Sequence, residues 1–97
     1  MAHVANVKVG NDWIKLEDLI STKTGSSFTF DDSKDYFISN IGTGICFMAD
    51  VPSIPSADEV IGLGLSHGQC AQFKKGAGDL YVKTHVGIAD IHIEEGE

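Results

Sequence analysis

The chain has 97 residues, which suffice for one domain and are too few for two. Hydrophobic residues make up 42% of it, which excludes a disordered chain, and eleven glycines with only two prolines are typical of tight turns between short strands. The net charge of −7, with seven lysines and no arginine, disfavours nucleic acid and anionic membranes as partners, because the chain would repel both.

No apolar stretch approaches the roughly 20 residues of a membrane-spanning helix. The first six residues also lack the basic start and apolar core of a signal peptide. Cys46 and Cys70 both lie in apolar runs, where buried free thiols are the main interpretation and a disulfide between them stays open. We therefore expect synthesis in a reducing cytoplasm.

Apolar residues recur mostly at alternate positions, which is the period of a β-strand. Glycine, aspartate and proline, the usual turn formers, separate these runs. The predicted strands, in chain order, cover 7–9, 13–16, 28–30, 36–38, 45–49, 60–65, 69–73, 80–84 and 89–93. At most one short helical turn is expected, at 16–21, where apolar residues would share a face. The pattern predicts an all-β fold, either a small antiparallel β-sandwich of jelly-roll type or a barrel.

The predicted domain organisation follows from these strands. Residues 1–9 would form an N-terminal arm or first strand, 10–94 the β-sandwich domain, and 95–97 an acidic tail. In the last strand, a shift of one residue would bury an aspartate, a histidine and a glutamate, so its register should be firmly set. The predicted core residues are Trp13, Phe28, Tyr36, Ile38, Phe47, Val82, Ile91 and Ile93.

No cluster of residues predicts catalysis, a metal or a cofactor. The four histidines are scattered rather than placed at the close spacing of zinc sites, so ordinary surface histidines are expected. The apolar neighbours of both cysteines argue against a Cys/His nucleophile. The acidic run 31–35 lacks the later glycine and glutamate of a calcium loop, and 62–68 has the wrong spacing for a dinucleotide fingerprint. We therefore predict a protein that is not an enzyme.

Two features favour binding by surface contact. In the loop 50–59, exposed Val51 and Ile54 alternate with Pro52 and Pro55, and prolines stiffen a loop, so these four are the candidate contact residues. A plain surface connection is the alternative. The aromatic residues Trp13, Tyr36 and Tyr81 could instead form a platform that stacks on sugars, although aromatic residues in alternating strands lie more often in a core or an interface.

The order of segments resembles a type of small structural protein from tailed phages. The resemblance rests on a tryptophan segment, a Tyr-x-Ile-x-Asn-x-Gly strand, a loop with two prolines, a Gly-Leu-Gly-Leu segment, and a closing Leu-Tyr-Val … Gly-x-Ala-x-Ile hairpin. In this chain these motifs occupy 13–19, 36–42, 51–55, 62–65, 80–84 and 87–94. Together the resemblance spans roughly residues 10–94.

The resemblance implies a β-sandwich that serves as a building block of a virion. It implies a capsid decoration (cement) protein that stabilises the shell, as a homotrimer in contact with itself and with the major capsid protein. A tail, connector or fibre component is the next alternative, and a carbohydrate- or receptor-binding module is a third. The resemblance carries no catalytic residues and no cofactor. The expected location is the virion, after synthesis in the cytoplasm of a bacterial host.

Overall fold

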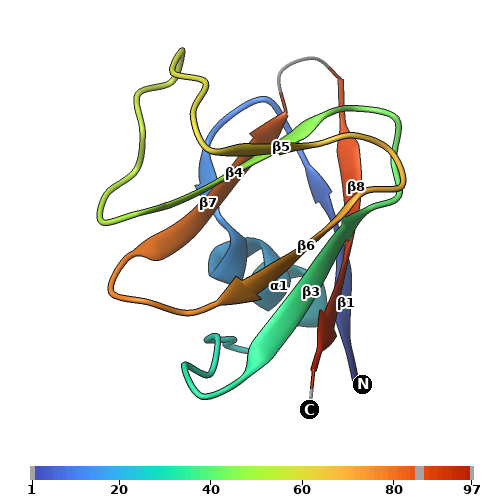
Figure 1. The fold of residues 1–97 in the computed structure, drawn as a ribbon, viewed down its shortest axis with the longest axis vertical. Helices are drawn as coiled ribbons and strands as arrows, with labels where there is room; N and C mark the ends of the chain where they lie inside the picture. Colours follow the sequence, from blue (N-terminus) through green and yellow to red (C-terminus); the bar gives the residue numbers. More distant parts are fainter. Residues whose placement is uncertain (1, 85–86, 97) are drawn as a thin grey trace.

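The computed structural model describes residues 2–84 and 87–96. It confirms the predicted all-β fold, because two four-stranded antiparallel sheets face each other as in a sandwich, with one short helix beside them (Figure 1). The first sheet contains, in spatial order, β1 (Ala2–Val9), β8 (Ala89–Glu95), β3 (Asp35–Asn40) and β6 (Cys70–Lys74). The second contains β2 (Ile14–Lys15), β7 (Asp79–Thr84), β4 (Cys46–Val51) and β5 (Leu63–Leu65).

Alternating apolar residues fill the space between the two sheets. In β8, Ala89, Ile91 and Ile93 are fully buried, and Ile93 lies opposite Ile38 of β3. The strand therefore has the predicted register, with its polar residues on the outside. Because the first sheet faces solvent on its other side, its strands β3 and β8 keep the period of two that the sequence shows.

Most of the predicted core residues are buried. Between the sheets lie the side chains of Tyr36, Ile38, Val82, Ile91 and Ile93. Trp13 is also buried, but it belongs to a separate cluster outside the second sheet.

Phe28 and Phe47 are only half-buried. Phe28 packs at the margin of the main core, and Phe47 packs against the separate cluster.

The helix α1 (Leu16–Thr24) has nine residues and is longer than the predicted turn at 16–21. It starts directly after β2 and buries Leu16 and Ile20, which lie four residues apart on one face. It ends at Gly25, whose φ of 75° is left-handed and whose N–H donates a hydrogen bond to the Ser21 carbonyl (2.9 Å).

The strand predicted at 28–30 is absent, because side chains of the helix take its backbone hydrogen bonds. The N–H of Phe28 donates to the Ser21 hydroxyl and that of Phe30 to the Glu17 carboxylate, both over 2.8 Å. Glu17 is itself buried and lies 3.6 Å from the Lys75 ammonium group. This segment is therefore fixed by a buried carboxylate rather than by a neighbouring strand.

The two ends of the chain lie side by side in the first sheet (Figure 1). The N-terminal segment is a strand, which was one of the two alternatives predicted for it. The acidic tail predicted at 95–97 starts later than expected, since Glu95 belongs to β8 opposite Tyr36. Gly96 is buried and its N–H donates to the Asp35 carbonyl (2.7 Å), while Glu97 lies outside the described residues.

Candidate contact surface

A second apolar cluster lies on the outer face of the second sheet. Trp13, Ala49 and Tyr81 are buried there, and Ala49 of β4 lies opposite Tyr81 of β7. The neighbouring strand residues Met48 and Val82 point the other way, into the main core. Strands β4 and β7 therefore carry apolar side chains on both faces. We call this group, with the adjoining Phe47, Val51 and Ile61, the outer cluster.

The loop 52–62, between β4 and β5, folds back onto the outer cluster. The Trp13 indole Nε1 donates a hydrogen bond to the Glu59 carbonyl (2.9 Å), and the Lys83 ammonium group donates to the Ala57 carbonyl (3.0 Å). The same ammonium group lies 5.7 Å from the centroid of the Trp13 ring, within range of a cation–π interaction. Only 5% of Lys83 is exposed. The side chains of Trp13, just before β2, and of Lys83 in β7 thus hold the loop at its far end.

The loop returns to the sheet at Gly62. This residue has a φ of 86°, and a Cβ atom there would overlap the Met48 carbonyl oxygen. Glycine is needed here for both reasons, because a side chain would strain the backbone and push β5 away from β4. A turn closed by the Glu59 N–H and the Ser56 carbonyl (3.0 Å) shapes the tip. The loop is therefore fixed at its tip and at its return.

The predicted contact residues lie on this loop but differ in exposure. Ile54 is 57% exposed and Pro52 is exposed, whereas Pro55 is half-buried. Val51 was expected to be an exposed contact residue, but it is half-buried and packs against the outer cluster, because it is the last residue of β4.

Val60 is 45% exposed on the same loop but was not predicted as a contact residue, because the run 60–65 was predicted to be one strand. Trp13 and Lys83 were not predicted to hold the loop, because their hydrogen bonds span 46 and 26 residues of chain and leave no local signal.

The aromatic platform proposed for sugar stacking is not formed on the surface. Trp13 and Tyr81 are 5% and 8% exposed beneath the loop 52–62, and Tyr36, at 2%, lies between the sheets. Stacking on a sugar requires an exposed ring face. With the loop in place, neither Trp13 nor Tyr81 offers one.

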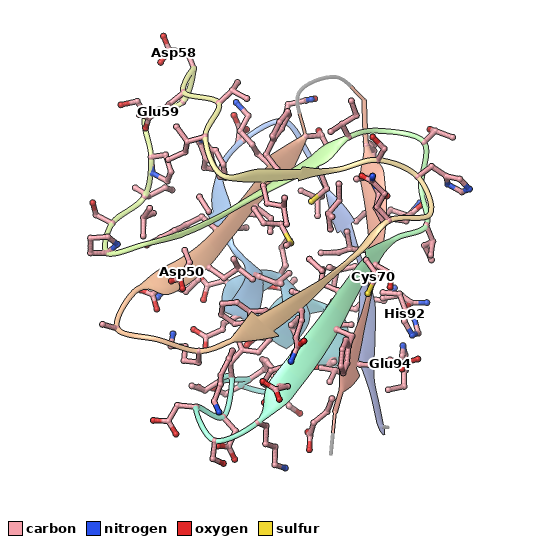
Figure 2. All side chains as sticks on the ribbon, in the orientation of Figure 1. Asp50, Asp58, Glu59, Cys70, His92 and Glu94 are labelled. Carbon is pink, nitrogen blue, oxygen red and sulfur yellow. The ribbon has the colours of Figure 1, made fainter. Side chains whose placement is uncertain are left out.

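The outer face of the first sheet is polar instead. The His3 and His92 rings stack with their centroids 4.7 Å apart, and the Asn6 side-chain oxygen lies 2.6 Å from His92 Nδ1 and 3.1 Å from His3 Nε2. His92 Nε2 lies 2.8 Å from the Glu94 carboxylate (Figure 2). The fold thus brings together two histidines that are far apart in sequence. Even so, the described residues hold no group of three or more side chains suited to a metal ion.

The two cysteines are not bonded to each other and lie in opposite environments. Cys46 is buried in the main core, and this burial raises the pKa of its thiol to about 12. Cys70 was expected to be buried but is exposed on the edge strand β6 (Figure 2). A thiol held protonated in an apolar core is a poor nucleophile, so Cys46 is structural.

The acidic run at 31–35 forms a turn that its own side chains stabilise. The Ser33 hydroxyl and backbone N–H both donate to the Asp31 carboxylate, over 2.7 and 2.9 Å. These two hydrogen bonds lower the pKa of Asp31. The arrangement is that of a solvated Asx turn.

Comparison of the chain with protein-family models, with curated proteins and with solved structures gives no match. The resemblance to small phage proteins therefore stays a prediction. Within the part of the chain that the structure describes, no helical segment has the length and apolar character that a bilayer crossing requires.

Proposed function

We propose that the protein acts by contact, as a structural component of a larger assembly, and that the loop 52–62 is the surface that binds its partner. The observation that carries this proposal is the fixed geometry of a loop with exposed apolar residues. Ile54 and Val60 are 57% and 45% exposed, while Trp13 and Lys83 hold the backbone beside them. A loop that is already ordered loses little entropy on binding, so more of its contact energy appears as affinity.

The charge on the loop indicates the chemistry of the partner. Asp58 and Glu59 are exposed beside the apolar residues and project from the tip of the loop (Figure 2). The whole chain carries a net charge of −7. A complementary partner has an apolar patch with a basic rim, because opposite potentials steer the encounter and suppress contacts with acidic proteins. Affinity for such a partner should fall as salt is added.

The resemblance to phage structural proteins supports a virion as the assembly. In that setting the partner is the major capsid protein, and the protein decorates the outer shell. A tail, connector or fibre position is the alternative within the same class. Repetition on a symmetric particle would multiply a modest contact by avidity, which suits a chain of this size.

The test is to locate the protein in particles made from the genome that encodes it. Quantitative mass spectrometry of purified particles gives its copy number, and labelled electron microscopy gives its place. A copy number on the order of hundreds supports shell decoration, while about six or twelve supports a tail or connector. Absence from the particles contradicts the virion assignment.

A variant tests the role of the loop itself. Ile54→Asp should lower occupancy on particles by at least about tenfold, since a buried carboxylate without a partner is costly at an interface. Thr22→Asp, at an exposed position of α1, is the matched control and should bind normally. Equal binding of both variants would remove the loop from the proposal.

A further inference from the structure

The charged residues are distributed very unevenly along the chain. Three segments contain no lysine, aspartate or glutamate: they are 36–49, 60–73 and 84–89. Charged residues make up 22% of the chain, so uncharged stretches of this length stand out. By contrast, four of the five residues at 31–35 are charged.

The fold brings the connections within the first two of these segments to one end of the sandwich. The β3–β4 and β5–β6 connections lie at the end opposite to the chain termini (Figure 1). The start of β8 joins them, because the Ile41 N–H donates to the Asp90 carbonyl (2.8 Å). The His67 ring also bonds the Gly42 carbonyl (2.8 Å). We call residues 41–45, 66–69 and 87–88 the loop end.

Three isoleucines of the loop end are exposed to solvent. Ile41 is 49% exposed, Ile45 is 44% exposed and Ile88 is 57% exposed. Each is of a residue type that is usually buried. Ile41 lies beside the start of β8, since its N–H donates to the Asp90 carbonyl, whereas Ile45 lies beside Phe47 of the second sheet. Exposed apolar residues from both sheets at one uncharged end indicate an interaction surface.

Buried hydrogen bonds keep the loop end in one shape. Asn40 is fully buried, and its side-chain nitrogen donates to the carbonyls of Gly44 (2.7 Å) and Leu65 (2.8 Å). Its side-chain oxygen accepts from the Gly42 N–H (3.0 Å). One side chain thus joins the β3–β4 connection to β5. The surface is therefore ordered before any partner arrives, which favours binding.

We propose that the loop end is where one copy of this protein binds a second copy. The charge of the chain is the reason to propose a second copy as the partner at this surface. Two chains of net charge −7 repel each other wherever their charged surfaces meet. The loop end holds no carboxylate of its own, so two copies can approach there with only the neighbouring Asp12 and Asp90 to repel them, and contact there keeps the acidic turns at 31–35 far apart. An uncharged apolar surface is also complementary to itself, as contacts between identical copies require.

The charged residues near the loop end are consistent with a contact between two copies. Asp90 lies beside Ile41 and has the Lys8 ammonium group at 3.8 Å, so its charge is partly offset. Asp12 follows the β1 strand at the same end and is exposed. Added salt should therefore screen the remaining repulsion and strengthen self-association, whereas it should weaken binding by the acidic loop 52–62.

The inference rests on the proposed function as an assembly component, and its test uses two matched variants. Ile88 and Ile54 are both 57% exposed, one on the loop end and one on the loop 52–62. Ile88→Glu and Ile54→Glu therefore make the same chemical change on different surfaces. Ile45→Ser serves as a milder second change on the loop end. Circular dichroism and thermal melting establish that each variant is folded before it is used.

Sedimentation equilibrium measures the association over a range of protein concentrations. Wild type is expected at a multiple of the 10.4 kDa chain mass, with tighter association at about 0.5 M than at about 0.05 M salt. Ile88→Glu should raise the dissociation constant by at least about tenfold, Ile45→Ser should raise it by less, and Ile54→Glu should leave it unchanged. A wild type that stays monomeric, or an equal effect of Ile88→Glu and Ile54→Glu, overturns the inference.

Binding to particles distinguishes failure of this inference from failure of the proposed function. If Ile54→Glu loses particle binding while wild type is monomeric, the contact role of the loop holds and the self-contact at the loop end is wrong. If wild type self-associates through Ile88 but is absent from particles, the self-contact holds and the virion assignment is wrong.

Discussion

The outer cluster and the loop end are both apolar regions outside the main core, and they differ in what covers them. Above the outer cluster, the loop 52–62 leaves Trp13 and Tyr81 only 5% and 8% exposed. At the loop end, Ile41 and Ile88 are about half exposed in the isolated chain. The first region therefore stabilises the fold, while the second is available for binding.

The comparison shows how one chain can separate stability from contact. Burying apolar surface contributes about 25 cal/mol per Å², but only where water is removed. At the outer cluster folding itself removes the water. At the loop end only association would remove it. Substitutions in the two regions should therefore affect different measurements.

The largest expected effect is on stability, and it distinguishes the outer cluster from the loop end. Trp13→Ala removes a buried ring and the hydrogen bond to the Glu59 carbonyl, so it should lower the free energy of unfolding by about 3 kcal/mol. Ile88→Ala, at an exposed position, should change it by less than about 0.5 kcal/mol. Urea denaturation followed by circular dichroism measures both. Similar losses of stability for the two variants would contradict the conclusion that only the outer cluster stabilises the fold.

The next effect tests how the loop end is held. Asn40→Ala removes the hydrogen bonds to the Gly44 and Leu65 carbonyls and leaves the Gly42 N–H only its longer bond to the Asp90 carbonyl (3.2 Å), which should lower the free energy of unfolding by about 2 kcal/mol or more. Asn6→Ala is the matched control, because Asn6 is exposed on the first sheet. Its effect should stay below about 0.5 kcal/mol. Hydrogen exchange should also show faster opening of residues 41–45 in Asn40→Ala alone.

A smaller difference in stability is expected between alanine substitutions at two glycines, Gly62 where the loop 52–62 returns to the sheet and Gly68 in a turn of the loop end. Gly62→Ala meets both a positive φ and the Met48 carbonyl, so a loss of about 2 kcal/mol is expected. Gly68 has a similar φ of 84° but open space around it, so Gly68→Ala should lose only about 1 kcal/mol. The difference between the two variants isolates the clash, since the backbone strain is common to both. Equal losses would show that β5 shifts to accommodate a methyl group.

Alternation of apolar residues was enough to predict the sandwich, because each strand of the first sheet buries one face. Strand β8 shows this best, with Ala89, Ile91 and Ile93 buried as predicted. Alternation between buried and exposed residues is lost in β7, because both faces of this strand are covered. Tyr81 and Lys83 are buried there only because a loop more than twenty residues earlier in the chain folds over them. Such cover depends on the tertiary fold and leaves no local pattern.

The contact surfaces were only partly predictable for the same reason. The prolines near Ile54 identified the loop, but the anchoring of its tip by Trp13 spans 46 residues and could not be read from the sequence. The uncharged segments 36–49 and 60–73 are visible in the sequence. That their connections meet at one end follows only from the order of the strands. The strand predicted at 28–30 was wrong because the Glu17 carboxylate takes a backbone hydrogen bond from that segment, a contact that also has no local pattern.

The smallest effect on stability is expected at the exposed thiol. Cys70→Ser should change the free energy of unfolding by less than about 0.5 kcal/mol, because the side chain is exposed on an edge strand. Cys46→Ser should lose about 1 to 2 kcal/mol, since it places a hydroxyl group in the main core. Urea denaturation of the two variants makes the comparison.

Thiol labelling tests the difference in exposure between Cys46 and Cys70 without a measurement of stability. At pH 8 the folded wild type should react at Cys70 only, because Cys46 is covered and its pKa, raised to about 12 by burial, keeps the thiol protonated. The folded Cys70→Ser variant should therefore react only as fast as the sandwich opens, and unfolding it in urea should expose the remaining thiol at once. Rapid labelling of folded Cys70→Ser would mean that the two sheets separate without global unfolding. Solvent would then reach the main core of the folded protein, as it reaches the loop end.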